Sequence, residues 1–207
     1  MSWEKGALIW FTGIAASGKS TIAKEVEARL RARGERVENL DADDVRKHIS
    51  PDLKWSPEDR DMNTKRLAWM GTLLSRNGCH TLVAAVSPLR SYRDRARGWA
   101  ERFMEVWVKT PVEECRKRDP KGLYAKADKG LVNDIAGLHQ PYEEPLHAEL
   151  VLETVGKTPA QCADLVMAQL EERGWIAREA EGAAAGQAYT RHDEERIKAR
   201  LKKLGYL

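Results

Sequence analysis

The stretch of sequence that decides the fold runs from Ala7 to Ser20 and reads ALIWFTGIAASGKS. Its first six residues, Ala7–Thr12, are mostly apolar and have the length and composition of a buried strand. Its last eight residues, Gly13–Ser20, fit the pattern GxxxxGK[ST] without a mismatch, and a helical pattern follows them. A strand, a glycine-containing loop and a helix in this order predict a loop whose backbone N–H groups bind phosphate.

This loop, a P-loop, predicts the binding of a nucleoside triphosphate. Its glycines let the backbone curl around a phosphate group, Lys19 is expected to reach the β- and γ-phosphates, and the Ser20 hydroxyl is expected to hold Mg²⁺. An ordinary strand–turn–helix without a ligand is the alternative, and the sequence context disfavours it. The residues expected to contact the nucleotide are Gly13, Ala15, Ala16, Ser17, Gly18, Lys19, Ser20 and Thr21.

Strands and helices alternate along the rest of the chain. Further strands are expected at 36–40, 81–86, 104–109 and 150–153, and helices at 20–33, 57–76, 91–101, 111–117 and 158–173. This alternation predicts an α/β fold of the P-loop NTPase type, with three layers and a central parallel sheet of about five strands. Four tryptophans fall on apolar positions and are expected in the core: Trp10, Trp69, Trp99 and Trp107.

Two segments do not follow the alternation. Residues 118–145 are polar, contain three glycines and have no clear period, so we expect a lid with some helix. Residues 176–207 begin as a low-complexity linker and end in an amphipathic helix with Ile197, Leu201 and Leu204 on one stripe. We therefore expect one nucleotide-binding domain over 1–175, followed by a C-terminal helical tail. The tail helix either packs on its own domain or serves in docking or oligomerisation.

Composition excludes several functional classes. The chain has 207 residues, with 35 Lys and Arg against 32 Asp and Glu, which is too balanced for bulk nucleic-acid binding. No apolar run approaches the roughly 20 residues that a membrane span needs, and we expect no secretory leader. The three cysteines are far apart and form no CxxC, which favours a reducing cytoplasm over a disulfide framework.

Carboxylates cluster at the end of the second expected strand, where the sequence reads DADDVR from Asp41 to Arg46. Open α/β sheets bind ligands at the carboxyl ends of their strands, so these side chains are expected beside the phosphate loop. A kinase needs a carboxylate to orient or deprotonate the attacking hydroxyl and an arginine to hold an anionic acceptor. A helix N-terminus that favours acidic residues explains the same cluster equally well.

Several further strings resemble the adenylyl-sulfate kinase (APS kinase) family, nearly collinearly from Gly6 to about Gly174. IWFTG and SGKSTIA resemble that family's opening, DADDVR resembles its DGDNVR, and WSPEDRDMN resembles its FSxxDRxEN. SPLR resembles its SPYR, RDPKGLY reproduces its lid string, and PYE followed by ELVLET resembles its ending. The resemblance implies ATP- and Mg²⁺-dependent phosphorylation of the 3′-hydroxyl of adenosine 5′-phosphosulfate (APS). It also implies a small-molecule nucleotide acceptor and a homodimer.

The resemblance also implies roles for individual residues. Asp43 is the expected base, and Lys19 and Ser87 are expected near the transferred phosphoryl group. Trp55 is expected to face the acceptor's adenine. Arg118, Lys121 and Lys126 are lid cations that could cover the phosphates when the lid closes; a solvated charged loop is the alternative, and it is the favoured one for Lys126. The residues expected to contact the acceptor are Asp41, Arg46, Trp55, Arg60, Asn63, Arg90, Lys121, Ile135 and Leu138.

The departures from the family pattern all lie on the acceptor side. The family lid reads FTGID, whereas this chain reads IAGLH from Ile135 to His139, so one aromatic face for the acceptor's base is lost. Ala42, Met62 and Leu89 replace a glycine, a glutamate and a tyrosine of the family strings. These changes leave two alternatives open: a related kinase for another nucleotide-linked acid, and a non-catalytic nucleotide-binding docking module. Intact Lys19, Ser20 and Asp43 oppose the second.

Overall fold

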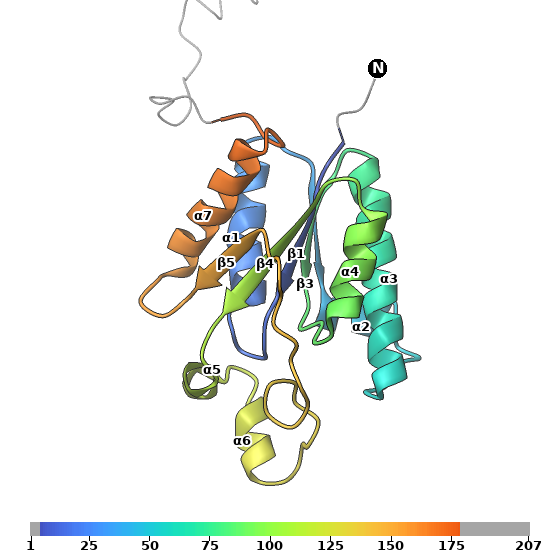
Figure 1. The fold of residues 1–207 in the computed structure, drawn as a ribbon, viewed down its shortest axis with the longest axis vertical. Helices are drawn as coiled ribbons and strands as arrows, with labels where there is room; N and C mark the ends of the chain where they lie inside the picture. The colour runs from blue at the N-terminus through green and yellow to red at the C-terminus, as the bar shows by residue number, and fades with distance from the viewer. Residues whose placement is uncertain (1–4, 179–207) are drawn as a thin grey trace, which may run out of the picture. The chain divides into compact units, whose positions relative to one another are not determined.

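Five parallel strands form the centre of the part that the computed structural model describes, residues 5–178 (Figure 1). They lie in the order β2-β3-β1-β4-β5. The central strand β1 pairs in parallel with its two neighbours, so that Leu8 lies between Thr81 and Phe103. The bounds are β1 Leu8–Thr12, β2 Val37–Asp41, β3 His80–Ala84, β4 Phe103–Lys109 and β5 Leu150–Glu153. The predicted five-stranded parallel sheet is confirmed.

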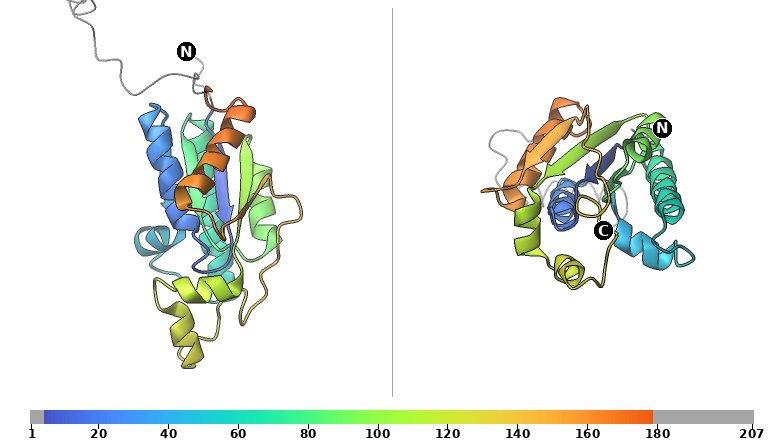
Figure 2. Two further views of the ribbon diagram at one scale, coloured as in Figure 1. Left: turned by 90° about the vertical axis from the view of Figure 1, so that its left-hand side faces the viewer. Right: turned by 60° about the horizontal axis from the view of Figure 1, so that its bottom comes forward.

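Helices cover both faces of the sheet (Figure 2). One face packs against α1 (Lys19–Ala32) and α7 (Pro159–Glu172), and the other against α3 (Pro57–Arg76) and α4 (Arg90–Trp99). All five residues of β1 are buried, as expected for a strand covered on both faces. The sheet is therefore the middle layer of the predicted three-layer fold.

Three short helices lie beyond the carboxyl ends of the strands: α2 (Ala42–His48), α5 (Val112–Arg118) and α6 (Leu123–Asp128). Helix α6 belongs to the predicted lid, whose later part returns past the sheet toward β5 (Figure 1). A small apolar cluster joins the lid to the P-loop, with Cys115, Tyr124 and Ile135 at its centre and Ile14 packed against it. The Tyr124 hydroxyl donates a hydrogen bond to the carbonyl of Ala15 over 3.0 Å.

The returning lid segment is anchored by Arg93 of α4, which is 1% exposed. Its guanidinium donates to the Glu105 carboxylate at 2.6 Å, to the Ser87 carbonyl at 2.5 Å and to the Glu143 carbonyl at 2.6 Å. Those three residues belong to β4, the β3–α4 loop and the returning segment. Because an unpaired charge inside a protein is costly, these bonds hold the three segments in one arrangement.

Two of the four tryptophan predictions are wrong. Trp10 is fully buried in the sheet, as predicted, whereas Trp107 in β4 is only partly buried and belongs to none of the buried clusters of the described residues. Trp69 and Trp99 instead lie on the outer sides of α3 and α4, with 51% and 39% of their surfaces exposed. Both helices carry apolar residues on more than one side, and periodicity alone does not say which side meets the sheet.

The chain divides into two units, 1–176 and 177–207. The predicted linker and tail helix, with Ile197, Leu201 and Leu204, lie outside the described residues apart from the first few linker positions. Within residues 5–178, none of the helices combines the length and the apolar character needed to cross a membrane.

Candidate active site

The P-loop is shaped by residues that adopt unusual backbone angles. Ala16 and Gly18 lie in the left-handed region, with φ of 59° and 108°. A Cβ on Gly13 would lie 2.6 Å from the Val108 carbonyl oxygen, so this position requires glycine. Helix α1 begins at Lys19, and no side chain caps its N-terminus. The open N–H groups of this turn are suited to bind an anion.

Lys19 points back into this loop. Its ammonium group donates to the carbonyls of Gly13 and Ile14, both at 2.8 Å, and to the Ser17 hydroxyl at 3.3 Å. Burial, which disfavours the charged form, lowers the pKa of Lys19 to about 8. Lys19, the charged side chain among the predicted nucleotide-binding residues of the P-loop, therefore already lies inside the phosphate-binding curve of the loop, which we call the cradle. Thr21 lies two residues further along α1 and is exposed.

Asp41 links the P-loop to the acidic cluster. One carboxylate oxygen accepts from the Ser20 hydroxyl at 2.5 Å, and the other accepts from the Asp43 backbone N–H at 2.9 Å and caps α2. Asp41 therefore caps a helix and also lies beside the phosphate loop, and the role of the cluster toward an acceptor stays a prediction. A hydroxyl and a carboxylate are oxygen ligands of the kind that Mg²⁺ prefers.

Few of the described residues are suited to hold a metal ion. No group of three or more His, Cys, Asp or Glu side chains that could hold a metal occurs in the described part of the chain. Mg²⁺ in phosphoryl-transfer sites commonly uses one or two protein oxygens and completes its shell with phosphate oxygens and water. Ser20 and Asp41 fit that pattern, whereas they do not fit a closed all-protein metal cage.

Asp43, the expected base, reaches toward the lid. Its side chain is half exposed and forms an ion pair with Lys121, in the loop before α6. This hydrogen bond raises the pKa of Lys121. Arg118 also meets the P-loop, because its guanidinium donates to the Ser17 carbonyl at 3.3 Å. The structure therefore brings two of the three predicted lid cations to the site, and Lys126 lies exposed on α6.

Trp55 and two arginines lie together on the expected acceptor side. The Trp55 indole is 57% exposed, and the guanidinium carbons of Arg46 and Arg60 lie 4.3 and 5.7 Å from its ring centroid. Burial lowers the pKa of Arg46. Arg60 donates to the Asp134 carboxylate at 2.5 Å and to the Trp55 carbonyl at 2.9 Å. The three predicted residues are thus assembled around one aromatic ring.

Asn63 lies one turn after Arg60 on α3 and is 4% exposed. Its side-chain oxygen is buried and has no hydrogen-bond partner among the described residues. A buried polar atom without a partner costs free energy, so a ligand that donates to it would be stabilised. This observation supports the predicted contact between Asn63 and the acceptor.

Three other predicted residues, Ser87, Arg90 and Ile135, bond to or pack against other parts of the protein. The Ser87 hydroxyl is buried and accepts from the Trp10 indole N–H at 2.9 Å, and the residue has a strained φ of 38°. Arg90 donates to the Glu144 carbonyl at 2.9 Å and so contacts the returning lid segment. Ile135 is 5% exposed inside the lid cluster. The contacts of these three with substrate remain predictions.

Leu138 lines a cavity of about 600 Å³ between the end of β4 and the returning lid segment. Trp107, Lys109 and His139 also line it, and none of these three was predicted as a site residue. Sequence reasoning also missed Asp134, the partner of Arg60, and Tyr124, which bonds to the P-loop. Tyr124 belongs to the RDPKGLY string, so that string was the available signal for it.

Comparison with known proteins agrees with this geometry. Residues 5–153 match the Adenylylsulphate kinase family model. Adenylyl-sulfate kinase from Halothermothrix orenii is 43% identical over 173 residues, covering 84% of this chain and 94% of the relative. The Mycobacterium tuberculosis APS kinase CysC, solved with AMPPNP and APS, has a TM-score of 0.78 and 38% identity, covering 81% of this chain and 98% of that one. A hexameric APS kinase from Thiobacillus denitrificans has a TM-score of 0.66 and 26% identity, covering 86% of this chain and 31% of that one. The chain belongs to the adenylyl-sulfate kinase family.

Proposed function

We propose that the chain transfers the γ-phosphoryl group of ATP to the 3′-hydroxyl of APS, giving 3′-phosphoadenylyl sulfate and ADP. The observation that carries this proposal is the position of Asp43. The backbone N–H of Asp43 is hydrogen-bonded to the Asp41 carboxylate, which in turn accepts from the Ser20 hydroxyl of the P-loop. The Asp43 side chain faces the lid. The expected base is therefore fixed next to the donor site and remains accessible to an acceptor.

The donor side acts through positive charge. In phosphoryl transfer the protein mostly positions the groups and stabilises negative charge on the phosphoryl oxygens. Lys19, the α1 N-terminus and Arg118 converge on the P-loop from different directions. When ATP binds, the Lys19 ammonium exchanges its carbonyl partners for the β- and γ-phosphates. Mg²⁺ would be held by Ser20, with Asp41 beside it, and would neutralise phosphate charge when bound.

The acceptor side positions the hydroxyl. Arg46 and Arg60 hold the phosphosulfate group, the Asn63 oxygen accepts a hydrogen bond from the acceptor, and the adenine stacks on Trp55. The acceptor's 3′-oxygen forms a bond to the γ-phosphorus while the bond from that phosphorus to the β–γ bridging oxygen breaks. The proton of the 3′-hydroxyl passes to Asp43. Asp43 must first be released by Lys121, which then becomes free to meet an anionic group of the acceptor.

The acceptor's identity is tested by a panel of nucleotides. Phosphorus NMR or a coupled ADP assay would compare APS with AMP, ADP, and other adenosine and guanosine phosphates, each with ATP and Mg²⁺. We expect turnover with APS to exceed that with the others by a large factor. Turnover with another nucleotide-linked acid but none with APS would favour the related-kinase alternative. The replacement of the family's lid phenylalanine by Ile135 is the reason for including that alternative.

The non-catalytic alternative is tested by changing Asp43. Asp43→Ala should abolish phosphoryl transfer and preserve ATP binding, because Asp43 contacts the lid and not the phosphate cradle. Asp44→Ala is the matched control, since Asp44 is an exposed carboxylate at the next position that pairs with Lys47. Equal turnover in both variants would remove Asp43 as the base.

We place the reaction in a reducing cytoplasm, because the three cysteines are buried and free.

A further inference from the structure

Ser87, in the loop between β3 and α4, has a backbone conformation that needs support from its neighbours. Its φ of 38° is positive, which costs free energy in any residue other than glycine, and such strained residues cluster at functional sites. The Trp10 indole N–H donates to the Ser87 hydroxyl at 2.9 Å, and that hydroxyl lies 3.4 Å from the Thr12 hydroxyl. Thr12 directly precedes Gly13, the first residue of the P-loop. The strained residue is therefore joined to the start of the donor site.

Arg93 of α4 supplies a second support for Ser87. Its guanidinium donates to the Ser87 carbonyl at 2.5 Å and to the Glu105 carboxylate at 2.6 Å. Arg93 and Glu105 are only 1% and 5% exposed. A buried ion pair usually adds little stability beyond what well-packed apolar residues would give. The presence of this pair beside a strained residue therefore points to a need for fixed orientation.

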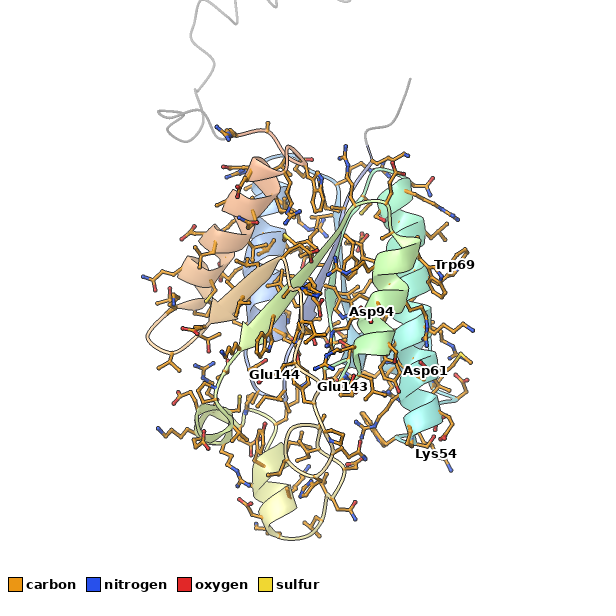
Figure 3. All side chains as sticks on the ribbon, in the orientation of Figure 1. Lys54, Asp61, Trp69, Asp94, Glu143 and Glu144 are labelled. Atoms are coloured by element: carbon orange, nitrogen blue, oxygen red, sulfur yellow. The ribbon has the colours of Figure 1, made fainter. Side chains whose placement is uncertain are left out.

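The segment that returns from the lid is bonded to the same place. Figure 3 shows Glu143 beside the lower end of α4, where its carboxylate accepts from the Arg90 backbone N–H at 2.7 Å. The Glu143 N–H donates to the Pro88 carbonyl at 2.8 Å, and the Glu143 carbonyl accepts from Arg93 at 2.6 Å. The Arg93 guanidinium carbon also lies 5.7 Å from the centroid of the Tyr142 ring. We call these residues the lid clamp: Pro88, Arg90, Arg93, Tyr142 and Glu143.

The loop before α6, at the other end of the lid, is attached in a different way. Its Lys121 forms an exposed ion pair with Asp43, and this pair must break in the proposed transfer. The bonds of the lid clamp are partly buried, and no step of the proposed transfer breaks them. One end of the lid is therefore fixed, whereas the loop at the other end must move.

We propose that Arg93 is a positioning residue for phosphoryl transfer. It holds the Ser87 backbone and the fixed end of the lid in one arrangement, so that Ser87 stays beside the transferred phosphoryl group while the loop before α6 moves. The Arg93 guanidinium is buried and bonded within the protein, so it acts through these residues and not on the substrate. This role rests on the proposed kinase reaction, in which Ser87 is expected near the reacting atoms.

The pair of Arg93 and Glu105 can be removed without leaving an unpaired charge. Arg93→Met/Glu105→Met replaces both buried charges with apolar side chains, a change that is often neutral or stabilising. Arg97, the other partner of Glu105, keeps both of its bonds to Glu149. We expect kcat with APS to fall by about 10²-fold, as for a small misplacement of reacting groups, while KM for ATP and for APS each change less than about threefold.

Arg95→Met/Asp61→Met is the matched control. This ion pair also begins on α4, but it joins α4 to α3 and contacts neither Ser87 nor the lid. The control should keep the wild-type kcat. Thermal denaturation of both double variants shows that each is folded, so a loss of stability cannot be mistaken for a loss of positioning.

Glu143 provides a second test that leaves the buried ion pair intact. Glu143→Ala removes the carboxylate that accepts from the Arg90 N–H, and we expect kcat to fall several-fold with little change in either KM. Glu143→Gln keeps an oxygen that can accept this bond and should restore most of the lost kcat. These two variants decide the outcome if Arg93→Met/Glu105→Met does not fold.

Amide hydrogen exchange tests the lid clamp without turnover. The Arg90 and Glu143 amide protons should exchange slowly in the wild type with or without ATP, and faster in Arg93→Met/Glu105→Met. Slow exchange together with no APS turnover in the wild type would overturn the kinase reaction, and the positioning role with it, but not the clamp itself. Wild-type kcat in the folded Arg93→Met/Glu105→Met variant or in Glu143→Ala overturns the positioning role directly. An equal fall in kcat in the Arg95→Met/Asp61→Met control, or unchanged exchange, does the same.

Discussion

The site has two halves that are built differently. In the donor half, which is the P-loop, the backbone of eight consecutive residues is expected to bind phosphate. The acceptor half depends on side chains from several segments that are distant in the sequence. Arg46 follows β2, Arg60 and Asn63 lie on α3, and Lys121 and Asp134 belong to the lid. Of the two lid residues, Asp134 is hydrogen-bonded to Arg60 and Lys121 is hydrogen-bonded to Asp43. The two halves therefore respond differently to a change of sequence.

A backbone site is specified locally, because the loop's conformation depends on a few glycines and on the start of one helix. A side-chain site is specified by tertiary structure, because each member needs its own support. Here the support is ionic, since Arg60 is held by Asp134 and Asp43 by Lys121. The donor half should therefore fail through the loss of a single residue, whereas the acceptor half, apart from the expected base Asp43, should change by degrees.

The strongest test on the donor side is Lys19→Ala. The ammonium group is the charged side chain inside the cradle, so we expect kcat to fall by about 10³-fold, similar to the loss of a key charge-stabilising group elsewhere. Steady-state kinetics with saturating acceptor would measure this. Lys24→Ala is the control, because Lys24 is exposed further along α1. If Lys19→Ala retained most of its turnover, the backbone would be sufficient for the donor half.

The corresponding acceptor-side test is Arg60→Ala. A hydrogen bond to a charged group contributes about 1.5–3 kcal/mol, so KM for APS should rise by roughly 10- to 100-fold while KM for ATP stays the same. Arg66→Ala serves as a matched variant, since Arg66 lies on the same helix but pairs with Asp52. An equal rise in both KM values would mean that the two halves are not separate.

The pH dependence of ATP binding separates the halves in another way. The pKa of Lys19 is lowered to about 8 in the ligand-free protein, and a bound phosphate would favour its protonated form. Above pH 8 the ATP Kd should therefore increase, by at most about tenfold per pH unit, with uptake of a proton on binding. Calorimetry in buffers of different ionisation enthalpy at pH 7 and pH 9 detects that proton, and Lys19→Arg should abolish the effect.

The Lys19 ammonium group should also make the stability of the ligand-free protein increase with pH. Its pKa is about 8 in the folded protein against 10.5 for an unperturbed lysine, so the unfolded chain holds the proton more tightly. Between these two values the unfolded state binds more protons, and stability from this group rises with pH. Lys19→Ala should flatten that part of the denaturation profile measured without ATP.

The smallest effect is expected for Lys121. Its ion pair with Asp43 joins two half-exposed or exposed side chains, and pairs of this kind contribute about 0–1 kcal/mol. Lys121→Ala frees Asp43 but removes a cation from the acceptor side, so we expect a change of only a few-fold in kcat/KM for APS. Lys126→Ala is the comparison, because Lys126 is exposed on α6. A change above about 100-fold would show that Lys121 takes part in the transfer itself.

The sequence alone was sufficient for the sheet and for the strand, loop and helix that form the P-loop. Helix 57–76 and strand 150–153 have the bounds expected from pattern and capping residues, since Ser56 caps α3 and Pro57 begins it. Trp69 and Trp99 were placed wrongly because apolar periodicity marks a face without saying what covers it. The partners Asp134 and Lys121 could not be paired with Arg60 and Asp43, because long-range ion pairs leave no periodic signal. The buried Ser87 hydroxyl likewise depends on its distant neighbour Trp10.

The hydrogen bond between the lid and the P-loop couples their local unfolding. The Tyr124 hydroxyl is bonded to the Ala15 carbonyl, and burial raises the pKa of Tyr124 to about 12, so this donor keeps its proton throughout the physiological range. Ile14 and the lid glycine Gly137 are also in close contact, since a Cβ on Gly137 would lie 2.5 Å from the Ile14 side chain. Helix α6 and the P-loop should therefore exchange their amide protons as one cooperative unit. A protease that cuts the lid would then loosen the nucleotide cradle as well.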